Sequence, residues 1–146
     1  MSEKALWSLV RSNLALRMFR VENRVAVGMP DVHYVRQGKS GWFEMKYMKE
    51  FKSGRKVSVG LKKHQHMWLK DYADHGGICW IMLRVGRTWL MLFHGDEDLV
   101  NMIKSNELIE RSVWYHKGIM KRENWQKLEE VIKNGRVCIS KKNSDS

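Results

Sequence analysis

The stretch PDVHYVRQGKSGWFEMKY, residues 30–47, decides the fold, because its alternation of apolar and polar side chains describes two adjacent strands of one sheet. Between the strands, RQGK at 36–39 predicts a four-residue hairpin loop. That loop sets Asp31 opposite Glu44, with their Cβ atoms about 5 Å apart. Two acidic side chains are therefore expected to meet on one face of the sheet.

The same register sorts the side chains of the hairpin between two faces. It pairs Val35 with Ser40 and Tyr34 with Gly41. One face then carries apolar side chains fit for a core, namely Val32, Tyr34, Phe43, Met45 and Tyr47. The other face carries Asp31, His33, Trp42, Glu44 and Lys46. A slip of one residue would destroy this sorting, so the pattern itself favours the register.

A glycine and the one proline of the chain stand directly before Asp31, in GMPDV at 28–32. Pro30 lacks an N–H group and restricts Met29 to extended conformations, so it suits the start of a strand or a bulge. Gly28 gives the backbone room to turn. We expect the two residues together to fix the direction of the Asp31 side chain.

Outward from the hairpin, the periodicity predicts helices and strands on both sides. A helix capped by Ser2 is expected at the N-terminus, and GG at 76 and 77 should end a crossover helix over 61–75. Strands are expected over 20–27, 31–35, 41–47, 78–85 and 88–93, the last two joined by a two-residue turn at Gly86 and Arg87. Further helices are expected over 95–104 and 121–135, while residues 106–120 stay ambiguous.

This order of elements predicts an α/β domain with a mixed sheet. At 146 residues the chain has the size of one compact domain, so a single domain over 1–146 is expected. Its core should cover about 1–94, followed by a C-terminal helical extension over about 95–139. The polar residues 140–146 are expected to fray.

The formal net charge of +11 favours a polyanionic partner, with nucleic acid first; a basic protein that is merely soluble is the alternative. Charged residues interrupt every apolar run, and the N-terminus lacks signal-peptide features, so a cytoplasmic protein without a membrane span is expected. Cys79 and Cys138 have no metal-binding spacing and are expected to be reduced, structural thiols.

The pair Asp31 and Glu44 indicates a metal, because two close carboxylates repel unless a cation lies between them. Oxygen ligands without His or Cys favour Mg²⁺ or Mn²⁺ over zinc. Lys46 points to the same face as Glu44, where it can position or help deprotonate a water and offset charge on a phosphorane. This pattern predicts phosphodiester hydrolysis.

These residues resemble a known family. PD at 30–31 and EMK at 44–46 look like the PD-(D/E)XK nuclease superfamily, and GMPDV, WFEMK and LKKHQHMWL are similar to its VRR-NUC and phage-type branch. The resemblance covers roughly residues 1–94. It implies a restriction-endonuclease-like core, with a helix, a three-stranded meander, a crossover helix and further strands, to which this chain adds C-terminal helices.

The resemblance also implies a set of site residues. Asp31 and Glu44 would be metal ligands, the carbonyl of Met45 a possible third, and Lys46 the catalytic lysine. The family often adds a glutamate from the first helix, which Glu3 fits, although Glu22 competes with it. Gln65 matches a glutamine that lies near the site on the crossover helix.

The activity expected is that of a Mg²⁺-dependent DNA endonuclease, with Mn²⁺ able to substitute and no organic cofactor. The resemblance suggests a homodimer acting on branched DNA such as Holliday junctions, in phage or bacterial replication, repair or recombination. DNA would be held by Lys49, Lys52, Arg55, Lys56, Lys62 and Lys63, with an exposed Trp42 the best candidate for base stacking. A noncatalytic DNA-binding or assembly protein and a nuclease acting on RNA remain alternatives.

Overall fold

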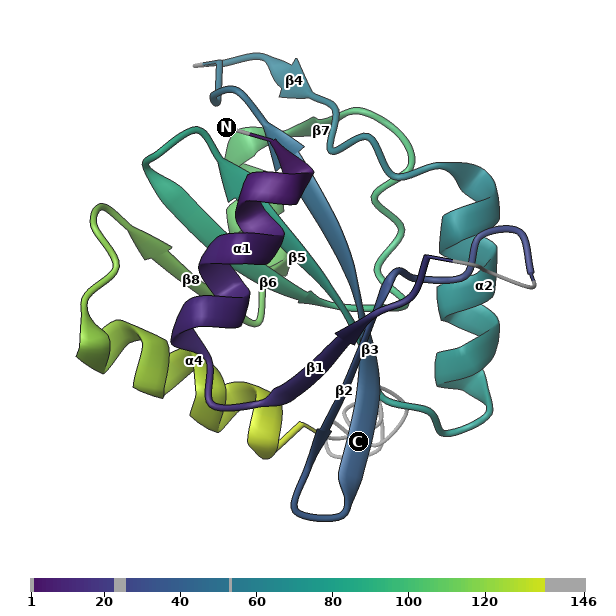
Figure 1. Ribbon diagram of the computed structural model, residues 1–146. Coiled ribbons are helices and arrows are strands. Elements are labelled where there is room, and N and C mark those ends of the chain that lie inside the picture. Colours follow the sequence, from purple (N-terminus) through teal and green to yellow (C-terminus); the bar gives the residue numbers. More distant parts are fainter. Residues whose placement is uncertain (1, 23–25, 53, 136–146) are drawn as a thin grey trace, which may run out of the picture.

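The computed structural model describes residues 2–22, 26–52 and 54–135, and these form a mixed α/β fold. Figure 1 shows α1 (Glu3–Asn13) and α4 (Arg122–Lys133) over one face of a twisted sheet, with α2 (Lys63–Asp74) on the other side. α3 (Ser105–Arg111) packs on the α2 side, because its Leu108 belongs to the same apolar cluster as Leu69 of α2.

Six strands form the main sheet in the order β1-β2-β3-β5-β6-β8. Their bounds are β1 Arg17–Arg20, β2 Val32–Arg36, β3 Lys39–Met48, β5 Cys79–Val85, β6 Trp89–His94 and β8 Trp114–Lys117. β3 and β5 are parallel, since α2 carries the chain between them, and the other described neighbours are antiparallel. A second, two-stranded sheet pairs β4 (Lys56–Val57) with β7 (Ile103–Lys104).

The register predicted for the β2–β3 hairpin is confirmed. Val35 pairs with Ser40, and the ladder runs back to Val32 opposite Phe43. The hairpin therefore aligns the residues before β2 with the middle of β3, as the alternation of the sequence requires.

The loop of this hairpin is shorter than the four residues expected. Arg36 pairs with Lys39, so Gln37 and Gly38 alone connect the strands. Both have positive φ, 48° and 81°, as a two-residue type I′ turn requires. Each strand gains one residue and the register is unchanged.

The sheet separates two apolar cores. The first core lies between the sheet and α1 and α4, and contains Leu6, Val10, Leu14, Val32, Tyr34, Phe43, Met45, Trp80, Met82, Leu90, Leu92, Trp125, Leu128 and Ile132. The second core lies toward α2 and α3, and contains Val57, Val59, Leu61, Leu69, Ala73, Cys79, Ile81, Leu83, Val85, Met91, Phe93, Leu99, Ile103 and Leu108. With apolar layers on both faces, the middle of β3 is shielded from water on both sides.

The three long helices α1, α2 and α4 agree with the predictions. The Ser2 hydroxyl caps α1 by accepting a hydrogen bond from the Ala5 N–H at 3.2 Å. α2 and α4 lie inside the ranges 61–75 and 121–135, and Asn134 is the C-cap of α4. No helix of the described residues is long and apolar enough to cross a bilayer.

The strand expected over 20–27 is wrong, because β1 covers Arg17–Arg20. Its partner β2 begins at Val32, which pairs with Arg20, so β1 has almost no ladder beyond that point. One further bond follows, from the Val21 N–H to the Asp31 carbonyl at 2.7 Å. Residues 23–25 lie outside the described part of the chain.

The helix expected over 95–104 is also wrong, since this segment contains β7 and the helix α3 begins only at Ser105. Gly95 is a packing residue, not a helix start: a Cβ there would lie 2.2 Å from the Sγ of Cys79. Asp98 accepts a bond from the Val100 N–H at 3.2 Å, a local turn that competes with a helix.

Two smaller corrections concern the last strands. Val85 pairs with Trp89, so the β5–β6 loop has three residues instead of the two expected at Gly86 and Arg87. The ambiguous segment 106–120 holds most of α3 and a sixth strand, β8, which extends the sheet beside β6. The C-terminal extension is therefore partly strand. The residues 136–146, including Cys138 and the tail, lie outside the described residues.

Candidate active site

The strand β3 places Glu44 and Lys46 two residues apart, so their side chains point to the same face of the sheet. Glu44 is 3% exposed and Lys46 is 5% exposed, and the Lys46 Nζ lies 3.9 Å from the Glu44 Oε2. With Arg84, these are the buried charged side chains among the described residues. Burying charges is costly, which makes such a pair typical of a functional site.

Asp31 directly precedes β2, which begins at Val32. Its backbone carbonyl is held by the Val21 N–H. The register Val32 opposite Phe43, continued by one residue, sets Asp31 opposite Glu44. Since Val32 and Phe43 point into the first core, the two acids point to the other face, toward α2.

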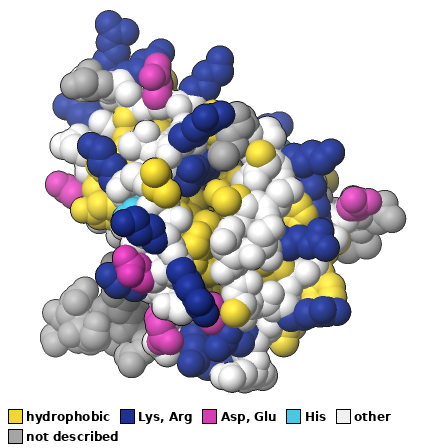
Figure 2. Space-filling view, turned by 60° about the vertical axis from the view of Figure 1, so that its left-hand side comes forward, with side chains coloured by type: hydrophobic (Ala, Val, Ile, Leu, Met, Phe, Trp, Pro, Cys, Tyr) yellow, Lys and Arg dark blue, Asp and Glu magenta, His cyan; other side chains and the backbone are white. Residues whose placement is uncertain are grey.

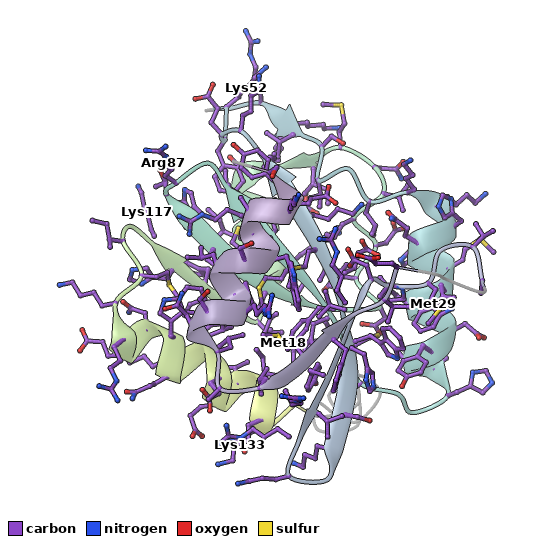
Figure 3. All side chains as sticks on the ribbon, viewed as in Figure 1. Met18, Met29, Lys52, Arg87, Lys117 and Lys133 are labelled. Atoms are coloured by element: carbon purple, nitrogen blue, oxygen red, sulfur yellow. The ribbon has the colours of Figure 1, made fainter. Side chains whose placement is uncertain are left out.

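The loop before Asp31 rests directly on the beginning of α2. Gly28 has a φ of 86°, and a Cβ there would lie 2.2 Å from the His64 carbonyl oxygen. Pro30 is buried, and Figure 3 shows the labelled Met29 on the side of the loop that faces α2. The backbone of α2 therefore supports the loop that positions Asp31.

Gly28→Ala should lower the free energy of unfolding by about 2 kcal/mol or more, because alanine is strained at this φ and its Cβ meets backbone. Urea unfolding measures the change. Gly38→Ala is the matched control: its φ is 81° but nothing lies within 4 Å of a Cβ there. Equal losses for the two variants would refute the close approach to His64.

Gln65 lies in the first turn of α2, half-buried, with a local hydrogen bond. Its Oε1 accepts from the Lys62 N–H at 3.0 Å, which satisfies a free amide at the helix start. Its backbone N lies 3.3 Å from where a Cβ of Gly28 would be, so it borders the loop of Asp31. A role for the Gln65 side chain in the site stays a prediction.

A third acidic ligand is not gathered with the pair. Glu3 is exposed on α1, which packs against the opposite face of the sheet, and Glu22 is exposed after β1. Within the described residues, no three His, Cys, Asp or Glu side chains come together as a metal site would require. The Glu3 side chain and the Met45 carbonyl remain predicted ligands.

The donor set nevertheless fits a hard divalent ion. Mg²⁺ is commonly bound through one or two carboxylates and keeps several waters, so Asp31 and Glu44 satisfy its usual protein requirement.

Basic side chains gather where β3 ends. Three of the six predicted DNA-binding residues, Lys49, Lys52 and Lys56, line a hollow of about 350 Å³, and Figure 3 shows Lys52 beyond the far end of β3. Arg55 and Lys62 are exposed on the segment that leads to α2. Lys63 lines a different hollow, of about 300 Å³, with His66 and Asp98 among its neighbours.

The positive charge is not confined to that end of the molecule. Figure 2 shows the side that lies at the left of Figure 1, where Lys and Arg side chains are widely spread and outnumber acidic ones. The field of the protein therefore attracts a polyanion over a broad surface, and the hollow beyond β3 is lined by three lysines and one acid, Glu50.

Toward the beginning of β3, the face of the sheet that carries Glu44 continues with a cluster of aromatic side chains. His33 and Trp42 lie 4.8 Å apart between ring centroids, and Trp68 of α2 meets Trp42 edge-on at 5.9 Å. Trp42 is thus half-buried, which corrects the expectation that it is exposed. The sequence indicated its face but not the helix that covers it.

Two buried titratable groups serve the fold. Burial raises the pKa of the Cys79 thiol to about 12, which agrees with the inert role expected for it. Burial lowers the pKa of Arg84, whose guanidinium donates hydrogen bonds to the carbonyls of Gly86 and Arg87 at 3.1 and 3.3 Å. Arg84 therefore closes the β5–β6 turn.

The mixed sheet, with a helix between parallel β3 and β5, is consistent with a restriction-endonuclease-like fold. Among solved structures the chain is similar to Hjc, a Holliday junction resolvase of the archaeal hyperthermophile Archaeoglobus fulgidus. The identity is 15%, the TM-score is 0.51, and the match covers 86% of this chain and 96% of that chain. This likeness confirms the predicted fold.

The comparisons of this sequence with known sequences do not assign the chain to a family. No family model matches the chain, and no curated protein matches it either. The narrower resemblance to the VRR-NUC and phage-type branch therefore stays a prediction.

Proposed function

We propose that this protein is a metal-dependent endonuclease that hydrolyses DNA phosphodiester bonds. The observation that carries the proposal is the burial of Glu44 and Lys46 side by side, on the face that Asp31 shares. A core position costs a carboxylate and an ammonium much of their hydration, and packing alone would favour apolar residues there. A chemical role explains why both are charged.

The roles follow from the positions of the side chains. Asp31 and Glu44 would hold Mg²⁺ or Mn²⁺, which supplies Lewis-acid chemistry and an acidified water when bound. Lys46 places an ammonium group beside Glu44, where it orients the attacking water and offsets the charge that develops on the phosphoryl oxygens. The aromatic cluster and α2 shield this face from bulk water.

The substrate we propose is DNA, with branched DNA preferred. The lysines that line the hollow beyond β3 provide phosphate contacts next to the catalytic face. The structural neighbour is itself a Holliday junction resolvase, and this supports a branched substrate. A homodimer with two active sites is part of the same proposal. We propose that residues 1–146 act as one nuclease domain, in replication, repair or recombination in a bacterial or phage-infected cytoplasm.

The test is a panel of linear, single-stranded, flapped and four-way DNA substrates of matched sequence. We expect cleavage in Mg²⁺ or Mn²⁺, no cleavage in EDTA, and a faster rate on the four-way junction than on the linear duplex. Removal of the metal stops the reaction because no side chain here replaces its Lewis acidity.

The outcomes separate the possibilities. Cleavage that persists in EDTA would contradict the metal dependence, and equal rates on junction and linear duplex would remove the preference for branches. DNA binding without Mg²⁺ or Mn²⁺ binding would instead support a noncatalytic DNA-binding protein. A four-way RNA cut as fast as the DNA would make the enzyme indifferent to the 2′-hydroxyl.

A further inference from the structure

The two-stranded ribbon of β4 and β7 sets two lysines directly opposite one another. Lys56 pairs with Lys104, and both side chains are exposed. Like charges at directly opposed positions of an antiparallel pair destabilise it. This register therefore places two positive charges on directly opposed residues, an electrostatic cost that a bound anion would relieve.

Buried side chains anchor the ribbon of β4 and β7 in the second core. Val57 pairs with Ile103, and each is 5% exposed and packed in the second core. Since neighbouring residues on a strand point to opposite faces, this anchoring directs Lys56 and Lys104 outward. The backbone that carries both lysines is thus held in place by buried neighbours, so less backbone freedom is lost on binding than for lysines on a loose loop.

The lysine pair adjoins the hollow beyond β3. Lys56 lines this hollow with Lys49 and Lys52, and Met48 forms part of its wall. Met48 lies two residues beyond Lys46 on the same strand, so it is on the same face and about 7 Å farther along. Figure 1 shows β4 and β7 together at this end of the sheet.

We propose that Lys56 and Lys104, with Lys49 and Lys52, bind a backbone phosphate of the DNA strand that flanks the phosphate to be cut. This inference rests on the proposed function and adds Lys104, which approaches from a distant part of the chain. Its charge complements a phosphate, and the repulsion between the two ammonium groups is relieved when the phosphate lies between them. Met48 and Met102 also line the hollow, and Glu50 is its one acidic lining residue among those described.

The test uses Lys104→Gln, which keeps a flexible polar side chain, one atom shorter, and removes its charge. Binding to a four-way DNA junction is measured in EDTA over a range of salt concentrations. We expect affinity to fall about eightfold at 0.1 M salt and the salt slope to decrease by about one, as for the loss of one phosphate contact. The melting temperature should stay the same or rise, because the opposed charges no longer repel.

Two further variants sharpen the test. Lys127→Gln, an exposed lysine of α4, is the matched control and should change affinity and slope by much less. The Lys56→Gln and Lys104→Gln double variant should lose less affinity than the product of the two single losses, because both lysines contact one phosphate.

The failure of this inference is distinguishable from that of the proposed function. If wild-type protein binds and cuts DNA while Lys104→Gln keeps its affinity and salt slope, the inference is overturned and the nuclease stands. A melting temperature several degrees lower for Lys104→Gln would also overturn it, since the lysine would then have a structural role. Wild-type protein that neither binds nor cuts DNA would defeat both.

Discussion

Asp31→Asn is expected to slow Mg²⁺-dependent cleavage of a four-way DNA junction by about a thousandfold, the largest effect predicted here. Asparagine has nearly the same shape but carries no charge, so the ion would lose one of its two anionic side-chain ligands. Single-turnover kinetics with enzyme in excess measure the chemical step. Because Asp31 sits where β2 begins, the backbone contacts that place it are kept.

The control for this variant is Glu110→Gln, which removes an exposed acid of α3 and should leave the rate unchanged. Without metal, Asp31→Asn should melt no lower than wild type, since it removes repulsion between two carboxylates. A cleavage rate within a few fold of wild type would show that Asp31 does not hold the ion.

Lys46→Met is expected to lower the rate of DNA cleavage by about a hundredfold or more. The variant should still bind the metal. The side chain is 5% exposed, and methionine fills a similar volume without the ammonium group. The metal-free variant should be less stable than wild type, because the buried Glu44 carboxylate loses the ammonium 3.9 Å away. Added Mg²⁺ should restore part of that stability.

Thermal unfolding with and without Mg²⁺, beside single-turnover cleavage, measures both expectations. Lys127→Met on the exposed face of α4 is the matched control and should change neither. If Lys46→Met cut DNA at the wild-type rate, the lysine would be a packing residue, whatever its effect on the melting temperature.

The centre of the sheet could be predicted because alternation and turn chemistry agree there. Val32, Tyr34 and Phe43 had to share a face, and this fixed the register and the side on which Asp31 and Glu44 lie. Even an error in the loop length did no harm, since the extra pair of Arg36 and Lys39 leaves that register unchanged.

The ends of elements could not be predicted in the same way, because they depend on partners distant in the sequence. β1 ends at Arg20 because its partner β2 begins at Val32 and has no further residues to pair with it. β8 forms a strand by pairing with the edge of β6 that β5 does not occupy. Gly95 looked like the start of a helix, but its role is to let the backbone pass the Cys79 thiol. The local sequence pattern does not reveal any of these long-range contacts.

The candidate site, like the fold, could be predicted only in part. The spacing of Glu44 and Lys46 shows that they share a face, but not that both are buried, which requires the helices on either side of β3. The contact of Gly28 with the His64 carbonyl and the meeting of Lys56 with Lys104 arise from tertiary packing alone. These long-range contacts determine how the residues of the motif and the lysines around them are arranged in space.

The most direct measurement is anomalous X-ray diffraction from crystals of the wild-type protein soaked in Mn²⁺. We expect a manganese peak between the carboxylates of Asp31 and Glu44, within bonding distance of an oxygen of each, and no such peak in Asp31→Asn crystals. A manganese ion bound elsewhere, with these two carboxylates left without metal, would show that Asp31 and Glu44 do not form the metal site.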